Sequence, residues 1–450
     1  MKGPVGDRAV VLGGSITGIL AARVLSEFYR EVMVVDRDQV IGVREARRGT
    51  PHARHAHGLH ARGCLILQEL FPGLIDDMRL AHLPVGDLGE QHWYYNARQF
   101  QPRRTGLTSV TAQRAVLEAY LRGKVAALPN VTFLERTELL CLLSSPGGTR
   151  VTGARLRPTA PQTADEFTLR ADLFIDATGR GSRTPVWLQE MGYGRPAETR
   201  MSIGLAYTTR LYRTPPDVPD GARFINCIAS PEFPRGAFFG QVDPHTTLLS
   251  LTGLHGDHPP TDPDAFHRFA RSLPVQDIHQ HVREAEPITD PVSFRFPASL
   301  RRRYERLPRL PERLLVLGDA ACSLNPNYSQ GMTVAAMEVM ALRTHLQRGT
   351  PSPLAFMRNV ARIVDNPWFI STTGDLRFAA TVGPRQHLAA RISNAYITRL
   401  HHAASKEPGV TDALMRVAGL IDRPTALVHP RLLLKALPPQ PPSPSPQGAR

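Results

Sequence analysis

Residues 9–18 read AVVLGGSITG and residues 32–36 read VMVVD, and these two stretches decide the fold. The apolar run that opens the first stretch predicts a buried parallel strand, and the apolar residues that continue after Gly18 predict a helix. Gly13 permits a sharp reversal, Gly18 lets the helix approach the strand, and the N–H groups at the helix start point at a pyrophosphate. Asp36 ends the second strand, where a dinucleotide-binding fold places the carboxylate that accepts the adenosine ribose hydroxyls. The two stretches therefore predict a nucleotide-binding βαβ unit.

The turn departs from the usual G-x-G-x-x-G pattern at one position. Ser15 stands where the middle glycine is expected, and its hydroxyl could itself donate a hydrogen bond to a phosphate oxygen. Two other interpretations remain open on this stretch alone: the turn merely closes an α/β unit, or the apolar run is the core of a signal peptide. The offset of Asp36 favours nucleotide binding.

The composition is that of an ordinary globular protein. The chain has 450 residues, of which 42% are apolar, enough for two or three domains with sizeable cores. Its net charge of +14 comes almost entirely from arginines, which are scattered and form no stripe. We therefore expect no nucleic-acid partner, although an acidic cofactor or an anionic membrane surface would suit this field. The local arginine run at residues 301–303 is expected to be a solvated helix face.

Cysteine spacing and hydropathy bear on the compartment. The four cysteines are widely spaced and form no C-x-x-C, which argues against a disulfide framework and against a zinc site. No apolar stretch reaches the roughly 18 residues of a membrane span. These patterns favour a reducing cytoplasm, with any membrane contact peripheral.

A histidine-rich loop follows the second strand, at residues 44–60. His55, His57 and His60 lie close together and raise the question of a metal site. Their spacing does not suit a helical pair of ligands, and no acidic residue lies within the cluster. We therefore expect no metal, and instead loop histidines near an anionic cofactor.

Strand-like segments later in the chain indicate a second domain. Residues 86–104 are polar and aromatic, and residues 201–254 contain several strand-like runs separated by proline and glycine. Together they predict an antiparallel sheet. Between them, residues 115–128 predict an amphipathic helix. Arg114, in its first turn, could reach a phosphate or be an ordinary surface arginine.

Two later turns share the design of the first. Residues 171–183 read ADLFIDATGRGSR, a short buried strand that runs into a turn of small residues. Residues 314–332 read LLVLGDAACSLNPNYSQGM, a buried strand that ends in Gly-Asp and precedes a long helix to about residue 346. That arrangement directs the Asp319 carboxylate and a helix N-terminus at one place, where we expect an electron-rich group.

The C-terminal part is expected to be helical from residue 353 to residue 437. Within it, residues 412–437 are amphipathic. Such a face either packs on its own domain or docks peripherally on a lipid surface. Residues 438–450 are rich in proline and serine, which predicts a disordered tail.

Three stretches in the same order resemble the single-component FAD-dependent monooxygenases of the para-hydroxybenzoate hydroxylase type. They are GGSITG at 13–18, DATG at 176–179, and GD at 318–319 followed by Pro326 and Gly331. Within that superfamily, further stretches resemble the actinobacterial branch that contains polyether polyene epoxidases: RRGTP at 47–51, RHAHGL at 54–59, NPNYSQGM at 325–332, NPW at 366–368 and GD at 374–375.

The sequence departs from that branch at two positions. His52 stands where a glutamine is common, and Ser329 stands where a glycine is common. Ser329 would alter the local shape near the flavin and so bears on the geometry of substrate and oxygen.

The resemblance implies an α/β fold. It combines a Rossmann-like FAD-binding domain of the glutathione-reductase type with an inserted antiparallel-sheet substrate domain and a C-terminal helical region. The expected boundaries are 1–85, 106–200 and 300–350 for the discontinuous FAD-binding domain, 86–105 and 201–299 for the substrate domain, 351–437 for the helical region, and 438–450 for the tail.

The resemblance also implies roles for individual residues. The glycine turn would hold the pyrophosphate, Asp36 the adenosine ribose, and Asp319 the ribityl chain. Arg114 would contact the phosphates, and the helix that begins near Gly331 would direct its positive end at the flavin pyrimidine ring. The full set of implied cofactor contacts is Gly13, Gly14, Ser15, Ile16, Gly18, Asp36, Arg37, Arg54, Arg114, Asp176, Gly179, Asp319, Pro326, Gly331 and Met332.

In this family NAD(P)H reduces FAD, O2 adds to the flavin C4a, and the resulting hydroperoxide transfers one oxygen atom to the substrate. For this chain the resemblance implies epoxidation of an olefin or hydroxylation of a hydrophobic natural-product intermediate. Because the flavin supplies the oxidant, the protein mainly excludes water and orients the substrate, and no side chain is assigned as an acid or base. No second βαβ fingerprint appears, so the nicotinamide would bind transiently.

Aromatic side chains of the expected sheet are candidates for the substrate pocket. Packing in the sheet core explains each of them at least as well. The aromatic residues of these strands that could line the pocket include Tyr94 and Phe238. The residues predicted to line it are Trp93, Tyr95, Phe224 and Phe239.

Other functions of the same fold remain open. One is a flavin-dependent reductase or dehydrogenase of a prenyl or polyketide substrate. Another is a flavin halogenase, although the W-x-W-x-I-P motif of those enzymes is missing. A third is a non-catalytic lipid carrier, because Rab GDP-dissociation inhibitors share the general fold; Asp36, Asp319 and the intact turns favour an enzyme. The sequence leaves the oligomeric state open.

Overall fold

The computed structural model describes residues 3–160, 165–214, 224–384 and 388–436. The chain divides into two compact units. The first unit contains residues 1–77, 112–201 and 298–369. The second unit contains residues 78–111, 202–297 and 370–450.

The expected C-terminal helical region does not form a unit of its own. Its residues up to 369 belong to the first unit, and its later residues belong to the second. The expected disordered tail, 438–450, lies outside the described residues.

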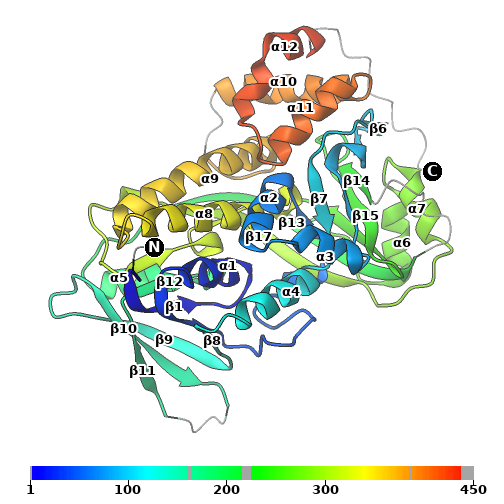
Figure 1. The fold of residues 1–450 in the computed structure, drawn as a ribbon. Coiled ribbons are helices and arrows are strands. Elements are labelled where there is room, and N and C mark those ends of the chain that lie inside the picture. Colours follow the sequence, from blue (N-terminus) through cyan, green and yellow to red (C-terminus); the bar gives the residue numbers. More distant parts are fainter. Residues whose placement is uncertain (1–2, 161–164, 215–223, 385–387, 437–450) are drawn as a thin grey trace. The chain divides into compact units, whose positions relative to one another are not determined.

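The first unit is built on a parallel sheet of five strands in the order β18-β12-β1-β2-β8 (Figure 1). Val10 and Val11 in the middle of β1 are completely buried, as expected of a parallel strand covered on both faces. The strands are β1 (Gly6–Leu12), β2 (Tyr29–Val35), β8 (Val131–Leu134), β12 (Leu173–Asp176) and β18 (Leu314–Val316).

Helices of the first unit pack on this sheet and on one another. Helix α1 contacts α4 and α8, and α2 also contacts α8. A separate antiparallel sheet contains β9 (Thr137–Ser144), β10 (Val151–Pro158) and β11 (Phe167–Arg170), and its strands β10 and β11 agree with the alternating pattern of residues 151–173, which predicts a hairpin. The helices are α1 (Ile16–Leu25), α2 (Ala61–Leu70), α4 (Arg114–Ala126), α5 (Thr184–Glu190), α8 (Gly331–Leu346) and α9 (Pro353–Asp375), the last of which continues past residue 369.

The second unit contains the expected sheet. It is part of an eight-stranded sheet in the order β19-β17-β13-β16-β15-β14-β5-β6, which begins with β19 (Cys322–Ser323) and β17 (Val292–Arg302). From β13 to β6 all neighbours pair antiparallel except β14 and β5, which are parallel. Helices α6 (Pro263–Arg271) and α7 (Gln276–Val282) pack on one face of this sheet. The strands are β5 (His92–Tyr95), β6 (Arg98–Gln99), β13 (Glu198–Arg213), β14 (Phe224–Ile228), β15 (Gly236–Asp243) and β16 (Thr246–Gly253). The mixed α/β fold class is therefore confirmed.

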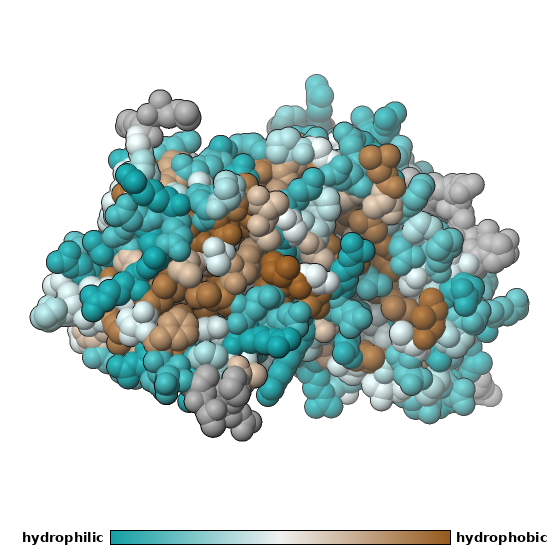
Figure 2. All heavy atoms as spheres, turned by 60° about the horizontal axis from the view of Figure 1, so that its bottom comes forward, coloured by the Kyte–Doolittle hydropathy of each residue, from teal (hydrophilic) through white to brown (hydrophobic). Residues whose placement is uncertain are grey.

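The helices α10 (Leu388–Ala404), α11 (Pro408–Ala418) and α12 (Pro430–Ala436) end the described chain. The amphipathic stretch expected at 412–437 packs part of its apolar face inside the second unit, since Leu414 and Met415 are buried, but Leu434 is 69% exposed. On the face drawn in Figure 2, apolar side chains appear in patches between hydrophilic ones. No helix among the described residues is long and apolar enough to cross a bilayer. Peripheral lipid contact stays a prediction.

The arginine run at 301–303 is not the solvated helix face that the sequence suggested. Arg301 and Arg302 are the last two residues of the extended strand β17 (Val292–Arg302), and both are almost fully buried. Arg301 donates to Asp365 at 2.7 Å, and Arg302 donates to the carbonyl oxygens of Ala320 and Arg180, each at 2.9 Å. These partners compensate the buried charges, which sequence periodicity alone does not reveal.

Candidate functional site

Four strands of the first unit end at one edge of the parallel sheet. Leu12 at the end of β1 is in register with Val35 on one side and with Asp176 on the other, and Asp176 is in register with Val316. The loops that follow these strands therefore leave the sheet side by side. Ligands of open α/β sheets bind outside the carboxyl ends of the strands, so this edge is the candidate site.

The turn after β1 is compact because two of its positions require glycine. Gly13 has a φ of 106°, which side chains rarely adopt. A Cβ atom at Gly18 would lie 1.8 Å from the Gly13 carbonyl oxygen, so only glycine allows α1 to start so close to the turn. Ser15 is the N-cap residue of α1, but its side chain makes no capping hydrogen bond.

Asp36 is bound to this turn. Its Oδ2 accepts a hydrogen bond from the Gly14 N–H at 2.7 Å and lies 3.4 Å from Arg47 Nη1. The side chain is 10% exposed. The carboxylate is therefore held at the end of β2 beside the nucleotide turn, where a ribose would need it.

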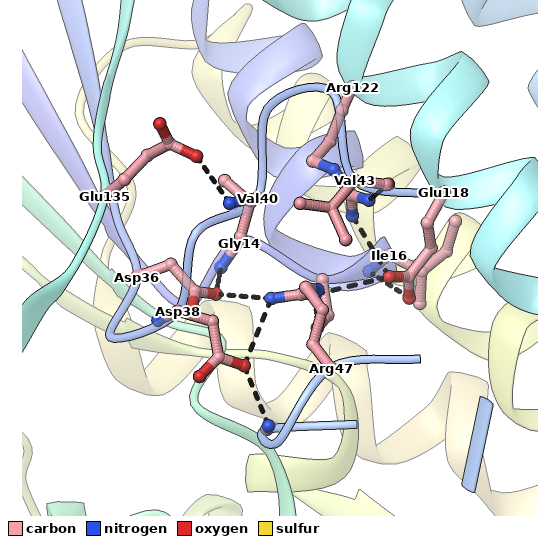
Figure 3. A network of polar contacts seen from close by, with 12 residues as sticks. Gly14, Ile16, Asp36, Asp38, Val40, Val43, Arg47, Glu118, Arg122 and Glu135 are labelled. Atoms are coloured by element: carbon pink, nitrogen blue, oxygen red, sulfur yellow. Dashed lines mark hydrogen bonds and ion pairs between the residues drawn. The ribbon is translucent and has the colours of Figure 1, made fainter. Parts of the chain in front are cut away.

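A buried carboxylate, Glu118, connects α4 to this turn (Figure 3). It accepts hydrogen bonds from Arg114 Nε at 2.8 Å, Arg122 Nη1 at 3.2 Å and Arg47 Nη2 at 3.3 Å, and from the Ile16 N–H at 3.2 Å. Burial alone would raise the pKa of Glu118, but these arginines, Arg114 first, hold the pKa below its usual value. Glu118 is therefore ionised and fixed.

Sequence patterns alone gave no role to Glu118, Arg47 or Arg122. A signal was present in the spacing of α4, because Arg114, Glu118 and Arg122 repeat at i, i+4 and so share one face of the helix. That face is buried, so the stripe forms an internal ion cluster instead of a solvated surface.

The histidines of the loop after β2 are neutral at pH 7, so they offer no positive charge to an anionic cofactor. Burial, with Arg114 next, lowers the pKa of His52 to about 2 and that of His57 to about 3, and burial lowers the pKa of His55 to about 4. His52 Nε2 lies 2.5 Å from Arg114 Nη1 and accepts from it, because a guanidinium only donates. Histidine at 52 therefore helps orient Arg114 and carries no charge of its own.

The described residues contain no group of histidine, cysteine and acidic side chains that could hold a metal.

The second turn is held together by Asp176. Its Oδ1 accepts from the N–H and the hydroxyl of Thr178, at 3.0 and 2.6 Å, and its Oδ2 accepts from the hydroxyls of Ser182 and Thr184. The side chain is completely buried. The carboxylate thus shapes the turn around Gly179, and its oxygens are already occupied by donors of the loop.

The third turn presents Asp319. This residue has an exposed surface, yet the atoms packed around its carboxyl group raise the pKa of Asp319 by burial, and Arg114 and Arg180 oppose that rise. Gly318 has a φ of 62° and donates its N–H to Glu338 Oε2 at 2.6 Å. The turn is therefore fixed from behind by a buried side chain of α8, and Asp319 keeps an exposed surface.

Glu338 gives the third turn a pH dependence that can be measured. Burial, with Asp319 adding to it, raises the pKa of Glu338 to about 8 from 4.5. The native protein keeps this proton up to about pH 8, whereas the unfolded chain releases it near 4.5, so the contribution to stability is lost as the pH rises between these values. We expect the free energy of unfolding of the wild type, relative to Glu338→Gln, to fall by roughly 1.4 kcal/mol per pH unit over this window.

Denaturant unfolding at pH 5 to 8.5 measures this difference. The exposed residue Glu312 provides a control, because Glu312→Gln should follow the wild type at every pH. Parallel curves for the wild type and Glu338→Gln would show that Glu338 is already ionised in the native state.

The start of α8 matches the needs of a flavin ring edge. Nothing lies within 4 Å of a Cβ placed at Gly331, and the first turn of the helix has no side-chain cap. Among the described residues the buried Oε1 of Gln330 has no hydrogen-bond partner, so it can accept from a ring N–H. Ser329 has a φ of 51°, a left-handed conformation that glycine adopts most readily. These features fit an FAD whose pyrimidine edge meets the helix.

The remaining residues predicted to contact the cofactor differ in their solvent exposure. Arg37 and Arg54 are exposed, Pro326 begins a short 3₁₀ turn that Asn325 caps, and Met332 is buried in the first turn of α8.

The structure separates the four predicted pocket residues. Trp93 packs edge-on against Phe224, with ring centroids 5.4 Å apart, and Tyr95 lies two residues along the same strand face. Phe239 lies on the opposite face of the sheet, in the core under α6 and α7. Its neighbour Phe238 packs against Phe224 at 5.2 Å instead. Because strand side chains alternate, a pocket on the Trp93 face includes Phe238 and excludes Phe239.

Comparisons with known proteins show the family of this chain. Residues 8–349 match the family described as the FAD binding domain. Protein Rv3254 of Mycobacterium tuberculosis is 32% identical over 444 residues, covering 94% of this chain and 92% of its own length.

Solved structures share the fold at low sequence identity. The flavin-dependent brominase Bmp2 superposes with a TM-score of 0.60 at 16% identity, covering 91% of this chain and 92% of its own. PqsL, a probable FAD-dependent monooxygenase from Pseudomonas aeruginosa, superposes with a TM-score of 0.61 at 16% identity, covering 83% of this chain and 98% of its own.

Proposed function

Because this chain belongs to the FAD binding domain family, we propose that it is a monooxygenase that uses FAD, NAD(P)H and O2 to transfer one oxygen atom to a hydrophobic small molecule. The observation that carries the proposal is the convergence of three strand-to-loop turns at one sheet edge, where Asp319, which keeps an exposed surface, and the start of α8 follow the third strand. When bound there, FAD would accept electrons from NAD(P)H and activate O2.

Residues of all three turns would bind this cofactor. The turn of Gly13 to Gly18 would bind the diphosphate, with Arg114 beside it, and Asp36 would accept the ribose hydroxyls. Asp319 would accept hydroxyls of the ribityl chain. The dipole of α8 would favour negative charge on the reduced ring.

The substrate would be an olefin or a ring compound that is epoxidised or hydroxylated. The aromatic face of Trp93, Phe224 and Phe238 supports a hydrophobic substrate, because such side chains bury large apolar surfaces and exclude water. No acid or base is needed at this face, since the protein would orient the substrate and leave the oxidation to the cofactor.

A combined spectroscopic and labelling experiment tests the proposal. Purified protein incubated with FAD should show the absorption bands of oxidised flavin, which NADH or NADPH should bleach anaerobically. With ¹⁸O2 and a panel of polyenes and aromatic compounds, the product should carry one labelled oxygen atom.

Other outcomes would favour other functions. Product formed without O2 would overturn the oxygenase proposal in favour of a reductase or dehydrogenase. A product that requires bromide or chloride would indicate a halogenase. A colourless protein that takes up no FAD would overturn the enzyme assignment in favour of a carrier.

A further inference from the structure

Ser15 uses its hydroxyl oxygen as an acceptor. Arg47 Nη2 lies 2.9 Å from Ser15 Oγ, and a guanidinium can only donate, so the serine oxygen accepts this hydrogen bond. The hydroxyl makes no cap to α1, and its own hydrogen takes part in no hydrogen bond within the described residues. Ser15 is half-buried at the start of α1. The hydroxyl hydrogen therefore remains available to a ligand at that helix start.

Arg47 cannot turn away from Ser15. Its side chain is 4% exposed, and Nη2 also donates to Glu118 Oε2 at 3.3 Å. On the other side, Nη1 lies 3.4 Å from Asp36 and 3.6 Å from Asp38 (Figure 3). A buried guanidinium with three carboxylate partners is costly to move, because each lost partner leaves a buried charge uncompensated. The direction of the Ser15 hydroxyl is thus set by the arginine.

Glu118 removes one backbone donor from the same helix start. It accepts the Ile16 N–H at 3.2 Å, and this N–H is one that a glycine-rich turn otherwise offers to a phosphate oxygen. Two further arginines of α4 hold the Glu118 carboxylate, so it stays in place when a ligand arrives. The turn has therefore lost one N–H donor and gained one O–H donor.

We propose that Ser15, fixed by Arg47 and Glu118, donates its hydroxyl hydrogen to the FAD diphosphate and so replaces the Ile16 N–H that Glu118 occupies. Serine at this position is then a specific requirement, because glycine would leave the turn one donor short. Glu118 is a positioning residue, and Ser15 makes the contact. This inference rests on FAD binding by the family and is independent of which substrate is oxidised.

Binding to the protein stripped of flavin tests the inference without any turnover. We would titrate the wild type, Ser15→Ala, Ser15→Gly and Ser15→Thr with FAD, with ADP and with riboflavin, by calorimetry. One charge-assisted hydrogen bond corresponds to about tenfold or more in the dissociation constant. We expect both Ser15→Ala and Ser15→Gly to weaken FAD and ADP about tenfold, Ser15→Thr to restore binding, and riboflavin, which has no phosphate, to be unaffected.

Matched variants separate this effect from damage to the helix. The hydroxyl of Ser26, the C-cap residue of α1, donates to the carbonyl oxygen of Arg23 in its own helix, so Ser26→Ala should bind like the wild type. Glu118→Gln should also weaken FAD, and its combination with Ser15→Ala should cost less than the two single changes summed, because both act through one chain of contacts.

Two results would overturn the inference. Ser15→Gly binding FAD as tightly as the wild type would show that the hydroxyl is not used. Equal losses for riboflavin and ADP would show a general distortion. If Glu118→Gln fails to fold, the Ser15 series still decides. Failure of the wild type to bind FAD would instead contradict the proposed function itself.

Discussion

Replacing Gly18 with alanine is expected to leave the first unit unable to bind FAD and largely unfolded. The added Cβ atom would lie 1.8 Å from the Gly13 carbonyl oxygen, and the clash is with backbone that no rotamer change can relieve. Either α1 moves away from β1 or the turn opens, and both disrupt a core in which Ile19 and Leu20 are completely buried. We expect a loss of about 4 kcal/mol or more in the free energy of unfolding. Denaturant unfolding and FAD titration measure the two effects.

A second glycine in the same unit is the matched control. Gly123 lies in α4, and nothing is within 4 Å of a Cβ placed there. Gly123→Ala should keep FAD binding and stabilise the protein by about 0.5–1 kcal/mol, the usual gain for alanine in a helix. If Gly18→Ala were as stable as the wild type and bound FAD, the close approach of α1 to the turn would not be essential.

Replacing Asp319 with alanine is expected to cause the largest loss of flavin among changes that leave the fold intact. Asp319 keeps an exposed surface at the third turn, and the Gly318 N–H behind it is held by Glu338 independently of the Asp319 side chain. The alanine variant therefore keeps the turn but lacks a charged acceptor for the ribityl hydroxyls. The loss of charge-assisted hydrogen bonds should raise the FAD dissociation constant by about 30-fold or more.

The conservative variant Asp319→Asn separates charge from hydrogen bonding. The amide oxygen still accepts, so its loss of affinity should be smaller than that of alanine. Asp7 is exposed at the far end of β1 from the turn, and Asp7→Ala should bind FAD like the wild type. Unchanged FAD binding by Asp319→Ala, with the unfolding curve also unchanged, would show that this turn does not contact the cofactor.

The charges around the nucleotide turn are balanced before any ligand binds. Three carboxylates and three guanidinium groups form the cluster: Asp36, Asp38 and Glu118 with Arg47, Arg114 and Arg122. A diphosphate therefore meets no surplus of positive charge there, and the histidines of the following loop add none because they are neutral. On the proposed function its binding would depend on directed donors, namely the remaining N–H groups of α1, the Ser15 hydroxyl and further N–H groups of Arg114.

The sequence alone was sufficient for the three turns and for the α/β class of the fold. Each turn follows a short apolar strand and depends on residues close to it in the sequence. Examples are the glycine at position 13, which takes a positive φ, and the apolar run before Gly318. Strand periodicity and the conformational freedom of glycine are local properties, so they can be predicted from the sequence without knowledge of the tertiary structure. The helix after Gly331 and the hairpin after residue 151 were predictable for the same reason.

Tertiary structure alone decided which charged side chains surround the nucleotide turn and which face of its own sheet each aromatic side chain occupies. Glu118 is 102 residues from its partner Ile16, and Arg302 is 122 residues from its partner Arg180. Phe238 and Phe239 differ only in which face of the sheet they occupy, and that depends on strand register. The energy that buries a charge or an aromatic ring comes from partners distant in the sequence, so composition and periodicity cannot identify them.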